Sequence, residues 1–362
     1  MTSAELYSPE LDKGEHRRWL PRFFSETERN YVHALALVLG TTAFFGILYA
    51  IEMQLGRWSD DIRLVRTPTE TCMRYLGLSH FFVAFVYMAT SRRMRSVKAW
   101  LFLAAMLAMG GGLCLGYSQL RTVAPLLGSM LFFAYFLTHD FRDQIFFYSV
   151  NRDMPSEYDR KSLNVVLFAL PFLLAGSLAS IVLAAAAFGA PGTELLAGFF
   201  GTLSPPLRQL TSVLLIVAVA AAALALKQRW TTAGLGTVRE FVRKNRPIFF
   251  VFGGTALVLA IGGAAGSSGD AVVILHVIAW YVFTIRQLAR APRAEGTTSL
   301  RSSLAAFNVL HIASAVLLLL VGAYWAFMMN NESSVPALNL VLSRESFRYW
   351  TILHVSVSWA GR

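Results

Sequence analysis

Long apolar stretches alternate with short polar and basic segments along most of this chain. Ten of these stretches approach the roughly 20 apolar residues that a helix needs to cross a hydrocarbon core. They cover residues 31–53, 75–90, 99–117, 122–138, 163–188, 208–226, 248–265, 270–288, 303–329 and 346–360. Lipid offers the backbone no hydrogen-bond partner, so such runs predict helices. The pattern therefore predicts an all-α, polytopic (multi-pass) integral membrane helix bundle with about ten transmembrane helices.

The first 30 residues follow a different pattern, because they contain no long apolar run. Between His16 and Phe24, basic residues are mixed with bulky apolar ones, which favours a position at a membrane interface. The first apolar stretch is too long for the core of a cleavable signal peptide. We therefore predict a cytoplasmic amphipathic N-terminal segment over residues 1–30 and a single transmembrane helical domain over residues 31–362.

Composition and charge agree with a membrane protein. The chain is 56% hydrophobic and 15% charged, whereas soluble domains contain about 25% charged residues. With the N-terminus in the cytoplasm, most of the 32 lysine and arginine residues fall in cytoplasmic segments, as the positive-inside rule requires. This distribution predicts an N-in, C-in topology in a bacterial-type inner (cytoplasmic) membrane. It also explains the net charge of +11 without a nucleic-acid partner.

Four histidines lie inside apolar stretches, each 8 to 12 residues from the nearest arginine at the predicted cytoplasmic end: His80, His276, His311 and His354. They therefore lie at similar depth, since a helix rises about 1.5 Å per residue. Ionisable rings are costly in hydrocarbon and usually face a functional site or the bundle interior. Imidazole is also the commonest metal ligand. The four residues predict a metal site, with non-haem iron or haem b as candidate cofactors.

Polar and aromatic residues occur on the same helical faces as these histidines, at spacings of three or four. They can hold the ligand rings through hydrogen bonds or line a substrate pocket. The group consists of Tyr87, Trp280, Asn308, Ser314, Thr351 and Ser358. The alternative is that each histidine is a packing contact bonded to a polar group on a neighbouring helix, and the sequence leaves it open.

A second cluster lies at the cytoplasmic end of the fourth stretch. It contains His139, Asp140 and Asp143, and His33 lies at the same predicted boundary. A histidine with two carboxylates can form a metal site, a general base or a clamp for a lipid headgroup. Alternatively, the charges pair locally at the end of a helix, with Arg142 beside either aspartate.

Three functions are compatible with these residues. The first is a membrane-embedded oxidoreductase or oxygenase with a histidine-ligated metal, acting on a lipid, an isoprenoid or a quinone. The second is a non-catalytic transporter or membrane-complex subunit with packing histidines, although long stretches without carboxylates make coupled transport a poorer account. The third is a b-type haem electron-transfer protein. The expected partners are the lipid bilayer and a hydrophobic small molecule.

Overall fold

The computed structural model describes residues 26–55, 67–89, 92–150, 160–191, 203–264, 268–290, 304–325 and 336–359. Within these ranges the chain is helical, which confirms the all-α prediction. The helices are α1 (Glu26–Leu55), α2 (Pro68–Ala89), the 3-10 helix η1 (Arg92–Arg95), α3 (Val97–Val123), α4 (Pro125–Val150), α5 (Arg160–Ala187), α7 (Pro205–Thr232), α8 (Val238–Lys244), α9 (Arg246–Ala264), α10 (Ser268–Arg290), α11 (Leu304–Ala323), α12 (Pro336–Leu342) and α13 (Arg344–Ser358). Each predicted apolar stretch has its centre in a separate helix. The predicted N-terminal segment lies almost entirely outside the described residues.

Four of the described helices are long and apolar enough to cross a membrane, judged by length and composition. The spans are Tyr31–Glu52 within α1, Val97–Val123, Arg160–Ala187 and Pro205–Thr232. Shorter apolar segments occur in α9, α10 and α11. These helices indicate a membrane protein. The predicted count of ten crossings is not established by these four.

Helix α4 is longer than the sequence predicted. The apolar run ends at residue 138, where the polar sequence from His139 to Gln144 begins, but the helix continues to Val150. Asp140, Asp143 and Gln144 are buried against other helices, so their polarity does not end the helix. As a result, His139 lies in the interior of the bundle.

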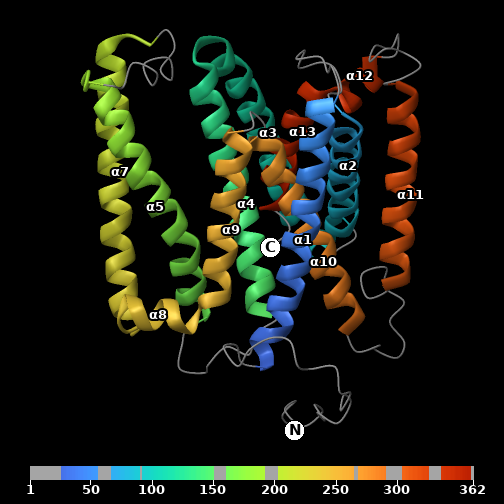
Figure 1. Cartoon of the computed structure of the whole chain (residues 1–362), viewed down its shortest axis with the longest axis horizontal. Helices are drawn as coiled ribbons and strands as arrows, with labels where there is room; N and C mark the ends of the chain where they lie inside the picture. The colour runs from blue at the N-terminus through green and yellow to red at the C-terminus, as the bar shows by residue number, and fades with distance from the viewer. Residues whose placement is uncertain are drawn as a thin grey trace.

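The helices stand largely side by side, with α5 and α7 paired at one edge and α11 at the other (Figure 1). The short helices α8 and α12 lie at opposite ends of the bundle (Figure 1). Helix α13 packs against α2, α3 and α4, and α10 packs against α1, α2, α4 and α9. The four helices α2, α4, α10 and α13 therefore meet in the interior.

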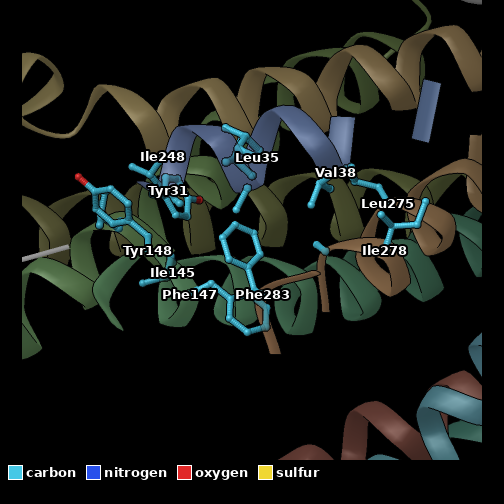
Figure 2. Close-up of a cluster of buried hydrophobic side chains, with 14 of the residues drawn as sticks. Tyr31, Leu35, Val38, Ile145, Phe147, Tyr148, Ile248, Leu275, Ile278 and Phe283 are labelled. Atoms are coloured by element: carbon cyan, nitrogen blue, oxygen red, sulfur yellow. The ribbon is translucent and has the colours of Figure 1, made fainter. Parts of the chain in front are cut away.

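A buried apolar cluster holds α4 against α10. Figure 2 shows side chains of α1, α4, α9 and α10 converging, with Phe283 of α10 among those of α1 and α4. The ring of Phe283 stacks on Phe147 with centroids 4.9 Å apart and on Tyr31 at 5.3 Å. Close packing of this kind is the main source of helix association in lipid. It fixes the two helices that carry His139 and His276.

Helix α13 is held by a close approach to α3. A Cβ atom added to Gly110 would lie 2.9 Å from Ser356 Oγ and 3.1 Å from the side chain of Leu353. The glycine therefore lets α13 lie directly against α3. Helix α13 begins after Ser343, whose hydroxyl accepts a hydrogen bond from the backbone N–H of Ser346. This packing sets the position of His354, which lies beside Leu353.

Candidate metal centre

Four histidines from four helices meet in the bundle: His80 of α2, His139 of α4, His276 of α10 and His354 of α13. One ring nitrogen from each residue lies within 4.8 Å of the corresponding atoms of the others. Imidazole nitrogens bind zinc at about 2.0–2.1 Å, so nitrogens around one ion lie within about 4 Å of each other. Small side-chain adjustments would thus bring all four to bonding distance. The group can hold a metal ion.

The four rings form a closed set of contacts. The centroid of His80 lies 4.8 Å from that of His354 and 5.4 Å from that of His276. The ring of His139 completes the set, 4.8 Å from His276 and 4.9 Å from His354. The Nε2 atoms of His139 and His354 face each other at 3.1 Å. Two imidazole lone pairs at this separation repel unless a proton or a metal ion lies between them.

Two polar groups fix the orientation of the rings. Asp140, which is fully buried, places Oδ1 3.1 Å from Nδ1 of His276. Ser358 places Oγ 3.1 Å from Nδ1 of His139, while its hydroxyl donates to the carbonyl of Val355. An acceptor at Nδ1 keeps the proton there and leaves Nε2 as a lone-pair donor, as in carboxylate–histidine–metal arrangements. Both rings are thereby oriented with Nε2 available to a ligand.

Several buried ring nitrogens have no hydrogen-bond partner within the part of the chain that the structure describes. In the group of four they are both nitrogens of His80 and Nε2 of His276, and outside the group Nε2 of His311 is in the same condition. His80 and His276 are each 1% exposed. Most buried polar atoms in proteins have a hydrogen-bond partner. A metal ion bound by the group of four would supply that partner to the unsatisfied nitrogens of His80 and His276.

The structure brings together three of the four predicted histidines, and His139 takes the place of His311. The ring of His311 packs instead against Trp280 and Tyr281, with centroids 5.2 and 4.8 Å apart. Similar depth does not determine which way a side chain points, because that depends on how each helix is rotated. The run from His139 to Gln144 is the sequence signal for the missing member, although it resembles an ordinary helix end. His33, which was grouped with His139, is exposed on α1 and is not in this group.

The other predicted residues have diverse positions. Ser358 contacts His139, and the ring of Trp280 lies 4.2 Å from that of His80. Ser314 bonds to Ser79 and to the carbonyl of His311, whereas Thr351 donates to the carbonyl of Phe347. Asn308 is half-buried on α11. The side chain of Tyr87 lies outside the described residues.

A cavity of about 730 Å³ adjoins the histidines. His80, His139 and His354 form part of its wall, together with Asp143, Trp280, Ser314 and Ser358. Oδ2 of Asp143 lies 3.7 Å from Nε2 of His139, an ion-pair distance rather than a hydrogen bond. The remaining wall is apolar: Leu78, Phe81, Phe82, Ala84, Phe85, Met88, Leu107, Leu317, Leu318, Val341, Trp350, Leu353 and Val357. Its volume falls within the roughly 300–1,000 Å³ of small-molecule sites.

Comparison with known proteins gives no family to which the chain can be assigned. No protein-family model matches it, no curated protein matches it, and no solved structure matches it. The function therefore has to be argued from the histidines and the cavity beside them.

Proposed function

We propose that this protein is a membrane-embedded oxidoreductase that binds one transition-metal ion through His80, His139, His276 and His354. Its substrate is a hydrophobic molecule held in the adjoining cavity. The observation that carries the proposal is the convergence of four imidazoles, three buried and that of His354 half-buried, with one nitrogen of each within 4.8 Å of the others. The unsatisfied nitrogens of His80 and His276 support it, because they lie within the group and a bound ion would satisfy them.

The donor set favours particular metals and disfavours haem. Imidazole nitrogens suit iron, copper and zinc, and non-haem iron is the ion we propose for an oxidation. A haem with two axial histidines needs a porphyrin between the rings. Here neighbouring imidazoles pack directly, with centroids 4.8–5.4 Å apart. A single metal ion bound directly by the imidazoles fits this arrangement better than a haem does.

The protein side chains have separate roles in the proposed reaction. A redox-active ion would supply activation of dioxygen or polarisation of the substrate when bound. Asp140 keeps the proton of His276 on Nδ1, and Ser358 does the same for His139. Asp143, at the cavity wall, is placed to accept a proton on Oδ2. The apolar wall excludes water from the substrate.

We also propose the N-in orientation in an inner (cytoplasmic) membrane, which follows from the loop charges. The basic helix α8 would then face the cytoplasm, and α12 would face the opposite side (Figure 1). Helix α13 has 15 residues and is thus about 22 Å long, less than the roughly 30 Å of a hydrocarbon core. The C-in part of the predicted topology depends on residues after 359, which lie outside the described ones.

Metal analysis of the purified full chain tests the binding part of the proposal. We expect about one iron, copper or zinc ion per chain by mass spectrometry and no Soret band in the absorption spectrum. Single alanine variants of His80, His139 and His354 should lose most of the metal. His311→Ala and His33→Ala are matched controls that should retain it, since neither residue belongs to the group.

Each other outcome has a defined meaning. Metal-free wild-type protein, or unchanged metal in the His354→Ala variant, would overturn the metal centre and favour a transporter or complex subunit. A Soret band that depends on the same histidines would replace the bare ion by haem. Metal-loaded protein that consumes no dioxygen with any neutral lipid supplied would overturn the oxidoreductase activity.

A further inference from the structure

The chemistry of the cavity wall indicates which kind of hydrophobic molecule the site accepts. We infer that the cavity binds the hydrocarbon chain of an uncharged, long-chain lipid, which enters sideways from the bilayer and places part of the chain at the histidines. The inference rests on the proposed function for the position of the reacting atoms. It adds the class of substrate and the route by which it arrives.

The charges of the wall disfavour an anionic group away from the histidines. No lysine or arginine is among the described residues that line the cavity, and Asp143 contributes a carboxylate. With the chain placed at the histidines, a phosphate or a fatty-acid carboxylate would lie along the apolar wall, away from the proposed metal ion. There it would lose its hydration without gaining a cationic partner, which is strongly unfavourable. The part of the molecule along the apolar wall is therefore uncharged.

The polar groups of the wall gather around the histidines, and the rest is aliphatic or aromatic. Phe81 and Trp280 lie against the rings of His354 and His80, with centroids 4.4 and 4.2 Å apart. Ala84 and Phe85 continue the wall along α2, and Leu318 continues it on α11. A compact polar ring without a long tail would leave most of this surface without complementary contacts. A hydrocarbon chain matches it along its length.

The exposed cavity residues define an opening on the outer surface of the bundle. Phe82 and Leu317 both line the cavity, yet they are 50% and 61% exposed. Phe85 and Leu107 also line the cavity and are exposed on the surface. These apolar side chains belong to α2, α3 and α11, whose outward faces would contact lipid tails. A chain in the bilayer can therefore reach the cavity without crossing water.

Tryptophan quenching by brominated lipids tests this inference, because Trp280 and Trp350 line the cavity. The purified, metal-loaded full chain is titrated in detergent with a brominated long-chain alcohol, a brominated fatty acid at neutral pH and a brominated phosphatidylcholine. We expect saturable quenching by the alcohol, and at least tenfold weaker binding of the other two. The Trp280→Phe variant should lose a large part of the quenching.

Two variants sharpen the test, with one matched control. Ala84→Phe fills the cavity and should weaken binding of the alcohol at least tenfold, whereas Ala313→Phe, at an exposed position on α11, should not. Leu317→Arg introduces a cationic side chain into the cavity wall at an exposed position. It should strengthen binding of the fatty acid relative to the alcohol. This gain of binding remains informative if Ala84→Phe does not fold.

The possible outcomes separate this inference from the proposed function. Equal binding of all three probes, or non-saturable quenching that Ala84→Phe leaves unchanged, would overturn the chain-binding inference even with full metal content. Conversely, saturable and selective binding of the alcohol to protein that holds no metal would overturn the metal centre alone. Quenching by the phosphatidylcholine as strong as by the alcohol would show that the wall does not select uncharged molecules.

Discussion

Asp140 is the residue whose burial is hardest to explain without the metal centre. A carboxylate at zero exposure in the interior of a helical bundle is costly, and it persists only with a partner. Its shortest contact is with Nδ1 of His276, at 3.1 Å, and the side-chain amide of Gln144 donates to the same oxygen at 3.5 Å. The contact with Nδ1 fixes the orientation of the His276 ring, because the carboxylate of Asp140 determines which ring nitrogen carries the proton.

We predict that Asp140→Asn weakens metal binding about 10- to 100-fold, the usual effect of losing such a partner. An amide has the same shape as a carboxylate, but its oxygen accepts a hydrogen bond less strongly. It can also turn its NH₂ group toward the ring. Metal affinity, measured by competition with a chelator, checks the prediction. Thr351→Val is the matched control, because Thr351 is buried on α13 and its hydroxyl donates to the carbonyl of Phe347 on the same helix. Equal affinities of the two variants would contradict this role of Asp140.

Helix α3 acts on the site through packing rather than through a ligand. Gly110 lies where the side chains of Leu353 and Ser356 approach the backbone of α3. A bulky side chain there would collide with Cβ of Ser356, which lies 3.1 Å from an added Cβ, so we expect it to displace α13. His354 is carried on the same turn of α13, so its distance to His139 depends on this contact.

Gly110→Val should therefore lower the metal content by more than half while leaving the chain inserted in the membrane. The reason is that the new side chain collides with α13, and the position of a ligand must be accurate to a few tenths of an ångström. Gly111→Val is the control on the same helix, since a Cβ at Gly111 meets no atom within 4 Å. Equal metal content in the two variants, measured by mass spectrometry, would show that α13 is not positioned by α3.

Helix α8 contains a capping box that makes its stability depend on pH. Glu240 accepts hydrogen bonds from the backbone N–H and the hydroxyl of Thr237, which lower the pKa of its carboxyl below the ordinary value. The contribution of the folded carboxylate is complete above the unfolded pKa, about 4.3 for glutamate. It is lost as the pH falls through the lowered pKa.

We expect amide hydrogen exchange in α8, corrected for its intrinsic pH dependence, to accelerate as the pH falls below about 4. Glu240→Gln should remove this dependence. Thr237→Ala should accelerate exchange at neutral pH roughly fivefold, equivalent to the ~1 kcal/mol typical of a lost cap. Exchange that is equally pH-dependent in the wild type and in Glu240→Gln would contradict this account.

At the scale of the whole molecule, the two short helices mark the two ends of the bundle. Helices α8 and α12 lie at opposite ends (Figure 1). Val238 and Leu340 are 65% and 60% exposed on these helices. In the proposed N-in orientation α8 lies in the cytoplasm, so we expect these residues to face opposite compartments.

Labelling with a membrane-impermeant maleimide checks this orientation. After Cys72 and Cys114 are replaced by serine, Leu340→Cys should react in intact cells, whereas Val238→Cys should react only after the membrane is opened. The reverse pattern would establish the N-out orientation. Reaction of both variants from one side would contradict a bundle that spans the membrane between its two ends.

The amino-acid sequence by itself determined the class of the protein and the depth of its histidines. Apolar runs of transmembrane length can only be helices in lipid, and distances along a helix are fixed by its rise per residue. Those two rules predicted similar depths for His80, His276, His311 and His354 without any coordinates, and three of the four belong to the group that the structure shows.

Only the tertiary structure decided which histidines meet. Whether His139 or His311 joins the other three depends on the rotation of α4 and α11 about their axes, and packing sets that rotation. The continuation of α4 through a run of charged residues depends likewise on neighbours that bury Asp140 and Asp143. The cavity also has no signature in the sequence, because its wall is built from residues far apart along the chain.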